Sequence, residues 1–297
     1  MSQLTIAQIR AIEAVARLGS FTRAADDLGI SQPAVSTQVR AVEELCSQRL
    51  FIRAGGSVEL APGAGPILAR IRVALGGIDD LERQLAGTAS LAIGSLSLGF
   101  SAHRIIMPIM RRFVELHPSV ALRARSASSE ELIAAIDSGT LDVAAVTWRD
   151  ANSRFATLQI SRRGFVIYGR KGHPLCKSGE VNLKKLSGVP MVLWNSGSHT
   201  RQIFESEAHR SGTLIVCALE VGSWDAAFAA TAAGIGLGVA LEGEVEADHE
   251  VDVCRLVGGN FDAGQYLICL PEFRNFAAVS ELFAIAEDAR LNRSMGA

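Results

Sequence analysis

The side chains of this chain best suited to making a set of specific hydrogen bonds lie between positions 32 and 40. Four polar residues recur there at helical spacing: Gln32, Ser36, Thr37 and Arg40. An amide can pair with adenine, a guanidinium with guanine or phosphate, and a hydroxyl with either. A helical face of this kind therefore has the side chains that the major groove of DNA requires.

The opposite side of the same segment indicates how such a helix would be held. Ser31 offers a hydroxyl cap at its start, and Pro33 is tolerated within its first turn. Apolar residues recur on the other side and predict a buried face. This face comprises Val35, Val39, Val42 and Leu45. The segment is therefore predicted to be the second helix of a helix-turn-helix.

A shorter helix is expected just before it. Ser20 and Thr22 can cap a helix that ends at Leu28, and Gly29 can adopt the left-handed conformation that stops it. Only residues 29–31 then separate the two helices. An ordinary helical hairpin with a solvated polar face has the same periodicity, so spacing alone leaves both interpretations open.

Charge does not separate these two interpretations. Residues 1–60 hold six arginines and six acidic residues, and the whole chain has a formal net charge of −2. Attraction to phosphate would then depend on the placement of Arg23, Arg40 and Arg53. The acidic residues expected to point away from DNA are Asp26, Asp27, Glu43 and Glu44. We expect modest binding by one copy and stronger binding by a pair.

Residues 20–53, together with residues 4–12 before them, resemble the N-terminal winged helix-turn-helix of LysR-type transcriptional regulators. The matching runs are residues 19–22, 24–25, 28, 31–36, 43–44 and 50–51. Cys46 departs from the pattern because it replaces a usual glycine, and Ala61 and Ala64 replace threonine and small polar residues. The resemblance continues through the order and length of the downstream segments, so it covers the full chain.

The resemblance also implies which side chains touch double-stranded operator DNA. The wing, residues 53–60, has one arginine where relatives often have several, so Arg53 would make most of its phosphate or minor-groove contact. The predicted DNA-binding residues are Thr22, Arg23, Ser31, Gln32, Pro33, Ser36, Thr37, Arg40 and Arg53.

Length and composition bound the class of protein. A chain of 297 residues with 48% hydrophobic composition is long enough for two to three domains with real cores. Its start lacks a basic flank followed by an apolar run, and no stretch approaches the roughly 20 apolar residues of a membrane span. We expect a cytoplasmic protein without a membrane partner.

The chain offers little that favours an enzyme. Its five cysteines are widely spaced without a CxxC pair, so structural thiols are favoured and a redox role for one of them stays open. No HExxH, Walker or GxSxG motif occurs. The glycine run at 234–238 follows a predicted helix and precedes a strand, which is the reverse of a nucleotide fingerprint. No catalytic residue, metal or cofactor is expected.

Residues 62–86 are predicted to form one long amphipathic helix. Its apolar stripe comprises Ile67, Leu68, Ile71, Val73, Leu75, Ile78, Leu81 and Leu85. Its expected outer face comprises Arg70, Arg72, Asp79, Asp80, Glu82 and Arg83. The stripe could pack on its own domain or on a second copy. The resemblance favours the second copy and implies a homodimer or homotetramer, with residues 87–90 as a hinge.

The remaining residues alternate apolar strands with amphipathic helices, which predicts a largely parallel α/β domain. The expected fold class is therefore α/β, with three parts. An all-α winged helix-turn-helix occupies residues 1–60, and a linker helix with its hinge occupies 61–90. A two-lobed effector domain resembling periplasmic binding proteins occupies 91–297, with lobe one at about 91–158 and 270–297 and lobe two at about 159–269.

Loops that open onto helix starts are the predicted effector site, because free N–H groups there favour anions. Three such loops and the end of one strand are expected to meet between the lobes, and the resemblance places the first two loops across that cleft. The predicted effector-binding residues are Ser101, Ala102, His103, Arg104, Thr147, Trp148, Asn195, Ser196, Ser198, Gly222, Ser223 and Trp224. His103 and Arg104 beside hydroxyl donors suggest a small anionic effector, either a carboxylate or a phosphonate-like compound.

The predicted function is a sequence-specific transcriptional regulator whose operator binding is modulated by this effector. Effector binding would change the angle between the lobes and, through the linker helices, the spacing of the DNA-binding heads. RNA polymerase is a further candidate partner. Two alternatives stay open: a regulator that is ligand-independent or controlled by a partner protein, and a small-molecule-binding protein or enzyme with an incidental helical N-terminus.

Overall fold

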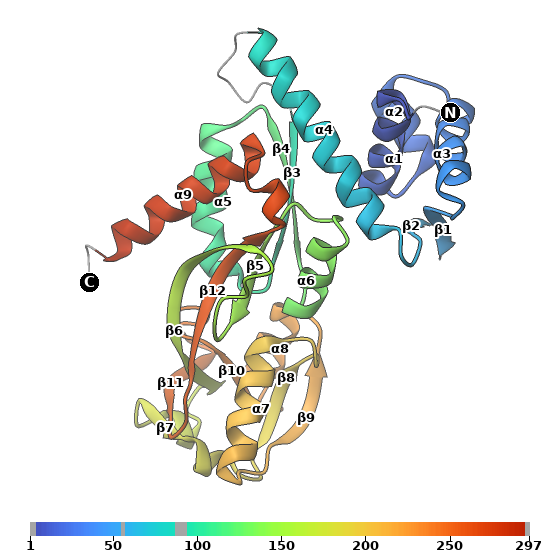
Figure 1. Cartoon of the computed structure of the whole chain (residues 1–297). Helices are drawn as coiled ribbons and strands as arrows, with labels where there is room; N and C mark the ends of the chain where they lie inside the picture. Colours follow the sequence, from blue (N-terminus) through green and yellow to red (C-terminus); the bar gives the residue numbers. More distant parts are fainter. Residues whose placement is uncertain (1–3, 55–56, 87–93, 295–297) are drawn as a thin grey trace.

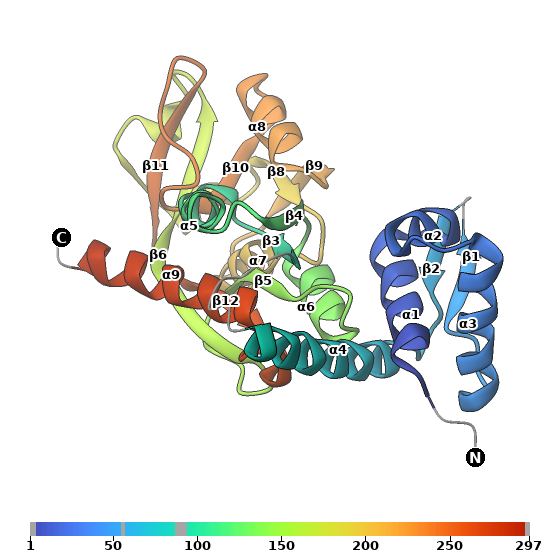
Figure 2. The same cartoon turned by 90° about the horizontal axis from the view of Figure 1, so that it is seen from above.

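The computed structural model describes residues 4–54, 57–86 and 94–294. A small N-terminal head is joined by one long helix to an α/β domain of two lobes (Figure 1). The long helix runs from the head along lobe one, as the second view also shows (Figure 2). Within the described part of the chain, no helix combines the length and the apolar character that crossing a membrane requires.

The head contains three helices and a β-hairpin. The helices are α1 (Ile6–Leu18), α2 (Phe21–Leu28) and α3 (Gln32–Cys46), and the hairpin pairs β1 (Phe51–Ala54) with β2 (Ser57–Leu60). Hydroxyl caps at Thr5, Ser20 and Ser31 start the helices. Gly29 ends α2 with φ at 66°, as its left-handed role requires. This arrangement confirms the predicted winged helix-turn-helix.

The head's core buries alanine and valine from all three helices against the start of the long helix. Val35, Val39 and Val42 are buried as predicted, but Leu45 is 45% exposed, so its assignment to the buried face was wrong. Leu45 lies in the last turn of α3, which ends at Cys46. Ser20 is the cap of α2, whereas Thr22 lies inside the helix and remains exposed.

The long helix α4 (Gly65–Ala86) begins three residues later than predicted. Its first half packs into the head's core through Leu68, Ile71 and Leu75. Farther along, Leu81 and Leu85 are 55% and 79% exposed. Arg72 contradicts the prediction of an outer position, because it is buried and pairs with two carboxylates. The predicted hinge at 87–90 lies outside the described residues.

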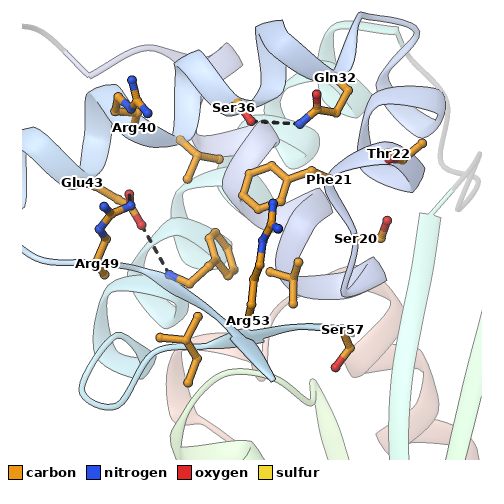
Figure 3. A pocket seen from close by; sticks show the side chains of 14 residues that line it. Ser20, Phe21, Thr22, Gln32, Ser36, Arg40, Glu43, Arg49, Arg53 and Ser57 are labelled. Atoms are coloured by element: carbon orange, nitrogen blue, oxygen red, sulfur yellow. Dashed lines mark hydrogen bonds and ion pairs between the residues drawn. The ribbon is translucent and has the colours of Figure 1, made fainter. Parts of the chain in front are cut away.

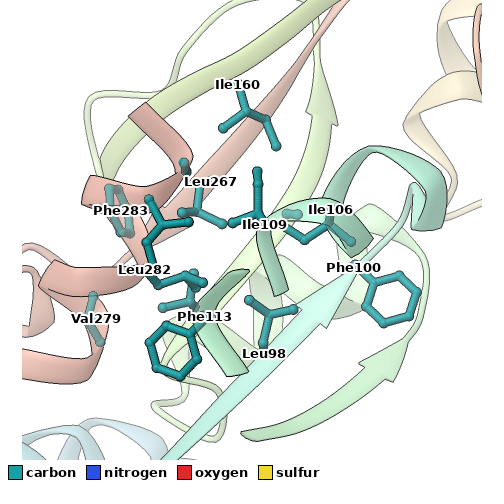
Figure 4. Packing of buried hydrophobic residues seen from close by; sticks show 14 of the residues in the cluster. Leu98, Phe100, Ile106, Ile109, Phe113, Ile160, Leu267, Val279, Leu282 and Phe283 are labelled. Atoms are coloured by element: carbon teal, nitrogen blue, oxygen red, sulfur yellow. The ribbon is translucent and has the colours of Figure 1, made fainter. Parts of the chain in front are cut away.

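Lobe one is a five-stranded sheet in the order β4-β3-β5-β12-β6. These strands are β3 (Gly94–Phe100), β4 (Val120–Ser126), β5 (Val143–Trp148), β6 (Ala156–Arg170) and β12 (Asp262–Cys269). Its helices are α5 (His103–Leu116), α6 (Ser129–Asp137) and α9 (Ala277–Ser294), with the short 3-10 helix η3 (Pro271–Phe273) before α9. Phe113, Leu282 and Phe283 join the sheet's apolar face in the core between α5 and α9 (Figure 4).

Lobe two continues from β6 in the order β6-β10-β8-β9, with β11 and β7 on the other side. Its strands are β7 (Glu180–Asn182), β8 (Pro190–Trp194), β9 (Val216–Val221), β10 (Leu237–Leu241) and β11 (Val251–Val257). Its helices are α7 (His199–Ser211), α8 (Trp224–Ala232), η1 (Pro174–Cys176) and η2 (Leu183–Leu186). Buried Phe165, Phe204 and Phe261 form part of its core.

Two details of the effector domain differ from the sequence prediction. The long strand β6 belongs to both lobes, and β12 pairs with β5 from Gly264 to Ile268, so the chain is back in lobe one a few residues before 270. The sheets are also mixed: β3, β4 and β5 are parallel, whereas β12 is antiparallel to both neighbours. The expected α/β fold with two lobes is otherwise confirmed.

Replacing Glu244 by glutamine is expected to stabilise the protein at about pH 8 and to have little effect near pH 4. The Glu244 side chain is buried beside β10, and burial raises its pKa from 4.5 to about 7. The unfolded chain releases this proton at lower pH than the folded chain, so wild-type stability falls as pH rises through that window, by about 3 kcal/mol in total. Chemical denaturation of both proteins across this pH range tests the effect, and a pH-independent difference contradicts it.

Candidate functional site

The polar face of α3 opens into a groove of about 650 Å³ that also involves α2 and the β-hairpin. Gln32, Ser36 and Arg40 line it from α3, Thr22 from α2 and Arg53 from β1 (Figure 3). The hairpin is anchored to the helices because Val58 N–H donates to the Gly19 carbonyl at 3.1 Å. The structure therefore brings five of the nine predicted DNA-binding residues onto one concave surface.

The first turn of α3 is held by its own side chains. Ser31 caps the helix by accepting from Ala34 N–H at 3.4 Å, and Gln32 Nε2 donates to Ser36 Oγ at 3.1 Å. The Thr37 hydroxyl donates to the Pro33 carbonyl at 2.9 Å. Gln32, Pro33 and Thr37 are nevertheless exposed. The Gln32 and Thr37 side chains can therefore give up these hydrogen bonds and contact a base or a phosphate without unfolding of the helix.

Arg40 and Arg53 are the cations of the groove that no other described residue engages. Both side chains are exposed and neither makes a hydrogen bond or ion pair with the part of the chain that the structure describes. They approach the groove from different elements, α3 and β1. Two unpaired guanidinium groups on one concave surface are suited to a duplex whose phosphates and guanines accept hydrogen bonds.

Two charged residues lie otherwise than predicted. Glu43 was expected to point away from DNA, but it lines the groove, where Oε1 accepts from Leu50 N–H at 2.8 Å and Oε2 lies 3.5 Å from Arg49 Nη1. It therefore holds the start of β1 against α3. Arg23 donates to the Leu18 carbonyl at the end of α1, and it is not among the residues that line the groove.

The second candidate site is a polar row in lobe one, in the region predicted to bind an effector. Thr147 on β5 faces Gln265 on β12 in register, and Gln265 faces Ser161 on β6. Gln265 Nε2 donates to Thr147 Oγ1. Ser101, directly after β3, lies 3.5 Å from Thr147 Oγ1 and donates to the Ala145 carbonyl at 3.4 Å. Ser101 and Thr147 are therefore neighbours, as predicted.

Lobe two contributes the N-terminus of α7 to the same place. Ser198 is buried and caps α7 by accepting from Arg201 N–H at 3.4 Å. The next residue, His199, contacts the Thr147 carbonyl through Nδ1 at 2.8 Å. A second contact across the lobes joins Gly197 and Glu130, whose N–H donates to the Gly197 carbonyl at 3.2 Å. The two lobes thus meet where the predicted effector loops at 101–104 and 195–201 approach each other.

Buried acceptors without partners mark this junction. Gln265 Oε1 and Asn195 Oδ1 make no hydrogen bond with the described residues, and Ser161 Oγ has none either. Gln265 is fully buried, so an unsatisfied amide oxygen costs about 1 to 3 kcal/mol. Such atoms are the ones that a bound small molecule or water can satisfy.

The remaining predicted effector residues divide into two groups. His103 and Trp224 meet across the lobes with ring centroids 5.0 Å apart, and Ala102 is buried before them as the N-cap of α5. Burial and neighbouring Arg104 lower the His103 pKa, which favours the neutral ring. Ser223 caps α8.

In the second group, Arg104 and Trp148 make contacts other than those predicted, and two loop residues are exposed. Arg104 pairs with Glu246 of lobe two at 3.0 Å and lines a groove along α5. Trp148 packs between Phe155 and Tyr266 in the core of lobe one, so its prediction as a wall of the cleft was wrong. Ser196 and Gly222 are exposed loop residues.

Sequence reasoning missed three residues that this geometry adds to the junction: Gln265, Ser161 and His199. Gln265 carried a usable signal, because it is a polar residue within the apolar strand 262–269. The described residues bring no group of three or more His, Cys, Asp or Glu side chains into an arrangement that could hold a metal ion. The groups that the junction offers are hydroxyls, a side-chain amide and the N-terminus of α7.

Curated regulators are similar to the chain over most of its length. The RuBisCO operon transcriptional regulator of Allochromatium vinosum is 27% identical over 300 residues, covering 99% of both chains. A probable hydrogen peroxide-inducible genes activator of Mycobacterium avium is 28% identical over 245 residues, covering 80% of this chain and 78% of the relative.

Solved structures share the fold at lower identity. Full-length OxyR from Pseudomonas aeruginosa matches 98% of this chain and 96% of its own with a TM-score of 0.77 and 18% identity. Full-length CbnR in complex with its target DNA matches 96% of this chain and 99% of its own with a TM-score of 0.55 and 18% identity. These likenesses establish the two-part architecture.

Two family models match parts of this chain. The model described as "Bacterial regulatory helix-turn-helix protein, lysR family" matches residues 6–64. The model described as "LysR substrate binding domain" matches residues 89–290. The first covers the head with the α3 groove, and the second covers both lobes with their polar junction. The chain belongs to the LysR family of transcriptional regulators, which bind DNA through the helix-turn-helix and respond to small effectors.

Proposed function

We propose that this regulator reads its operator with the groove between α2, α3 and the β-hairpin. Gln32, Ser36 and Arg40 would enter the major groove, and Arg53 would contact the adjacent backbone or minor groove. The observation that supports this most strongly is the pair of exposed arginines without partners among the described residues on that surface. Thr22, Ser31, Pro33 and Thr37 would serve as flanking contacts, and Arg23 as a support of α1.

We further propose that the effector binds at the polar junction between the lobes. The N-terminus of α7, at Ser198 and His199, would receive an anionic group such as a carboxylate or phosphonate. Ser101, Thr147 and Asn195 would contact the remainder. Arg104 is an unsuitable anion ligand while Glu246 engages it. No described residue donates to Gln265 Oε1, so the effector would also carry a hydroxyl or an ammonium group.

We also propose that the protein self-associates. Leu81 and Leu85 leave an apolar stripe exposed on the second half of α4, which a second copy would cover in a homodimer or homotetramer. Two heads in one assembly would compensate for the few cations in each head. RNA polymerase is a further proposed partner, and a DNA-binding regulator of this kind would act in the cytoplasm. We assign no catalytic role.

The proposal is tested by selecting DNA from a random-sequence duplex pool with the full-length protein. The expected product is a pseudo-palindrome with half-sites separated by roughly 34 Å or a multiple of it. A thermal-shift screen of small carboxylates, amino acids, phosphonates and phosphate esters should then find compounds that change affinity for that duplex. Absence of enriched sequence would favour a small-molecule-binding protein or enzyme. Enrichment without any ligand response would favour control by a partner protein.

A further inference from the structure

A chain of charged residues connects the helix-turn-helix to the effector domain. Arg72, in the first half of α4, is only 8% exposed. Its Nη1 lies 2.9 Å from Asp142 Oδ1 in lobe one, and its Nη2 lies 3.4 Å from Glu13 Oε1 on α1 of the head. One guanidinium therefore bridges the two functional parts of the molecule.

The bridge is connected at one end to the helix-turn-helix and at the other end to the strand that leads to the lobe junction. In the head, Arg17 pairs with Glu13 at 3.2 Å and with Asp27 on α2, the first helix of the helix-turn-helix. In lobe one, Asp142 Oδ2 accepts from Ser97 N–H at 2.7 Å and from Ser97 Oγ at 2.6 Å. Ser97 lies on β3, the strand that ends just before Ser101 at the lobe junction.

A cleft of about 500 Å³ between the head and lobe one is lined by these charged residues. The planar fork of an arginine side chain fixes the directions of its hydrogen bonds, so it constrains angle as well as distance. Buried ion pairs add little net stability compared with apolar packing, because desolvation offsets their attraction. Arg72 is therefore better suited to holding an orientation than to stabilising the fold.

We propose that Arg72 is a positioning residue for operator recognition, which sets the angle at which the head is held on lobe one through Glu13 and Asp142. The inference rests on the proposed DNA-reading function. A shift of β3 at the lobe junction moves Asp142 with Ser97, and Arg72 passes that shift to α1 and α2. In a pair of copies this angle sets the separation of the two recognition helices.

The test uses four full-length variants: Arg72→Met, Arg72→Lys, Asp142→Asn and Arg10→Met. Methionine keeps most of the buried aliphatic stem, and lysine keeps the charge without the fork. Arg10→Met is the matched control, because Arg10 pairs with Glu82 at 3.3 Å between the same helices, α1 and α4, but is exposed. Thermal unfolding first establishes that each variant is folded.

The decisive measurement compares affinity for the selected duplex, for a single half-site, and for duplexes with one base pair inserted or removed between half-sites. We expect Arg72→Met and Asp142→Asn to keep half-site affinity within about twofold but to bind the full duplex about tenfold more weakly, because the heads are no longer held at the matching separation. Discrimination among spacings should shrink as well. Arg72→Lys should lie between, and Arg10→Met should match wild type.

A second readout requires no DNA. Small-angle X-ray scattering of the free protein should show a larger maximum dimension for Arg72→Met and Asp142→Asn than for wild type and Arg10→Met. Superimposable scattering curves, or unchanged spacing preference in Arg72→Met, would overturn the positioning role. Equal losses on half-site and full duplex would also overturn it, since they indicate general damage to the head. Failure of wild type to select any duplex counts against the proposed function, and the scattering result still decides the role of Arg72.

Discussion

Replacing Arg40 and Arg53 together by alanine should weaken binding to the selected operator about a hundredfold at physiological salt. Each guanidinium is exposed and has no partner among the described residues, so each is available to a phosphate or guanine. A contact of this kind contributes about 1 to 3 kcal/mol. Fluorescence anisotropy over a series of salt concentrations measures the loss. The slope of log affinity against log salt should also fall by about 1 to 2, because fewer counterions are released.

Two matched variants test whether the loss of affinity is specific to the arginines of the groove or follows from the loss of any positive charge. Arg111→Ala removes an exposed arginine of α5, far along the chain from the head, and should leave operator affinity unchanged. Arg49→Ala should have a smaller effect than Arg40→Ala, because Arg49 already shares its charge with Glu43. If the double variant binds within about twofold of wild type at every salt concentration, another surface reads the operator.

The head was the most predictable part of the molecule because its structure is local. Ser31, Pro33 and Gly29 act within a few residues of their own positions, so their roles can be recognised from spacing alone. Glu43 shows where local reasoning ends. Its carboxylate accepts from Leu50 N–H, seven residues away across a turn, so a residue expected to point away from DNA holds the start of the hairpin instead.

Residues whose partners are distant in sequence could not be placed from periodicity. Arg72 fits the solvent side of a helical stripe, but it is buried by Glu13 and Asp142, which lie 59 and 70 residues away. Trp148 is the last residue of β5, an end that was expected to face the cleft, yet the Trp148 ring packs against Phe155 and Tyr266. Both cases depend on how separate elements pack together, which no single segment encodes.

The second large effect is expected on effector affinity, through a contact with Gln265. Gln265 Nε2 donates to Thr147 Oγ1, and the hydroxyl oxygens of Thr147 and Ser101 lie 3.5 Å apart. Gln265 Oε1 has no hydrogen-bond partner among the described residues. An effector that supplies the donor should therefore bind more tightly than its analogue without one, by about tenfold or more.

Three compounds of one size separate the possibilities: propionate, lactate and alanine. All share a carboxylate for the N-terminus of α7, and only the last two carry a hydroxyl or ammonium donor beside it. We expect lactate or alanine to raise the melting temperature of wild type more than propionate does, as measured by thermal shift and calorimetry. Equal responses to all three compounds, or none to any, would contradict the assignment of Gln265 Oε1 as an effector contact.

Gln265→Leu should abolish that preference without destabilising the free protein. The substitution removes the donor to Thr147, which contributes about 1 kcal/mol, but it also removes a buried oxygen whose lack of a partner costs about as much or more. A merely structural glutamine would instead lower the melting temperature and leave the ligand preference intact. Gln265→Glu sharpens the distinction at a pH high enough to ionise the new carboxyl, whose pKa burial raises, because the carboxylate keeps the acceptor and adds charge. It should favour the ammonium of alanine over the hydroxyl of lactate, since only the ammonium can neutralise a buried carboxylate.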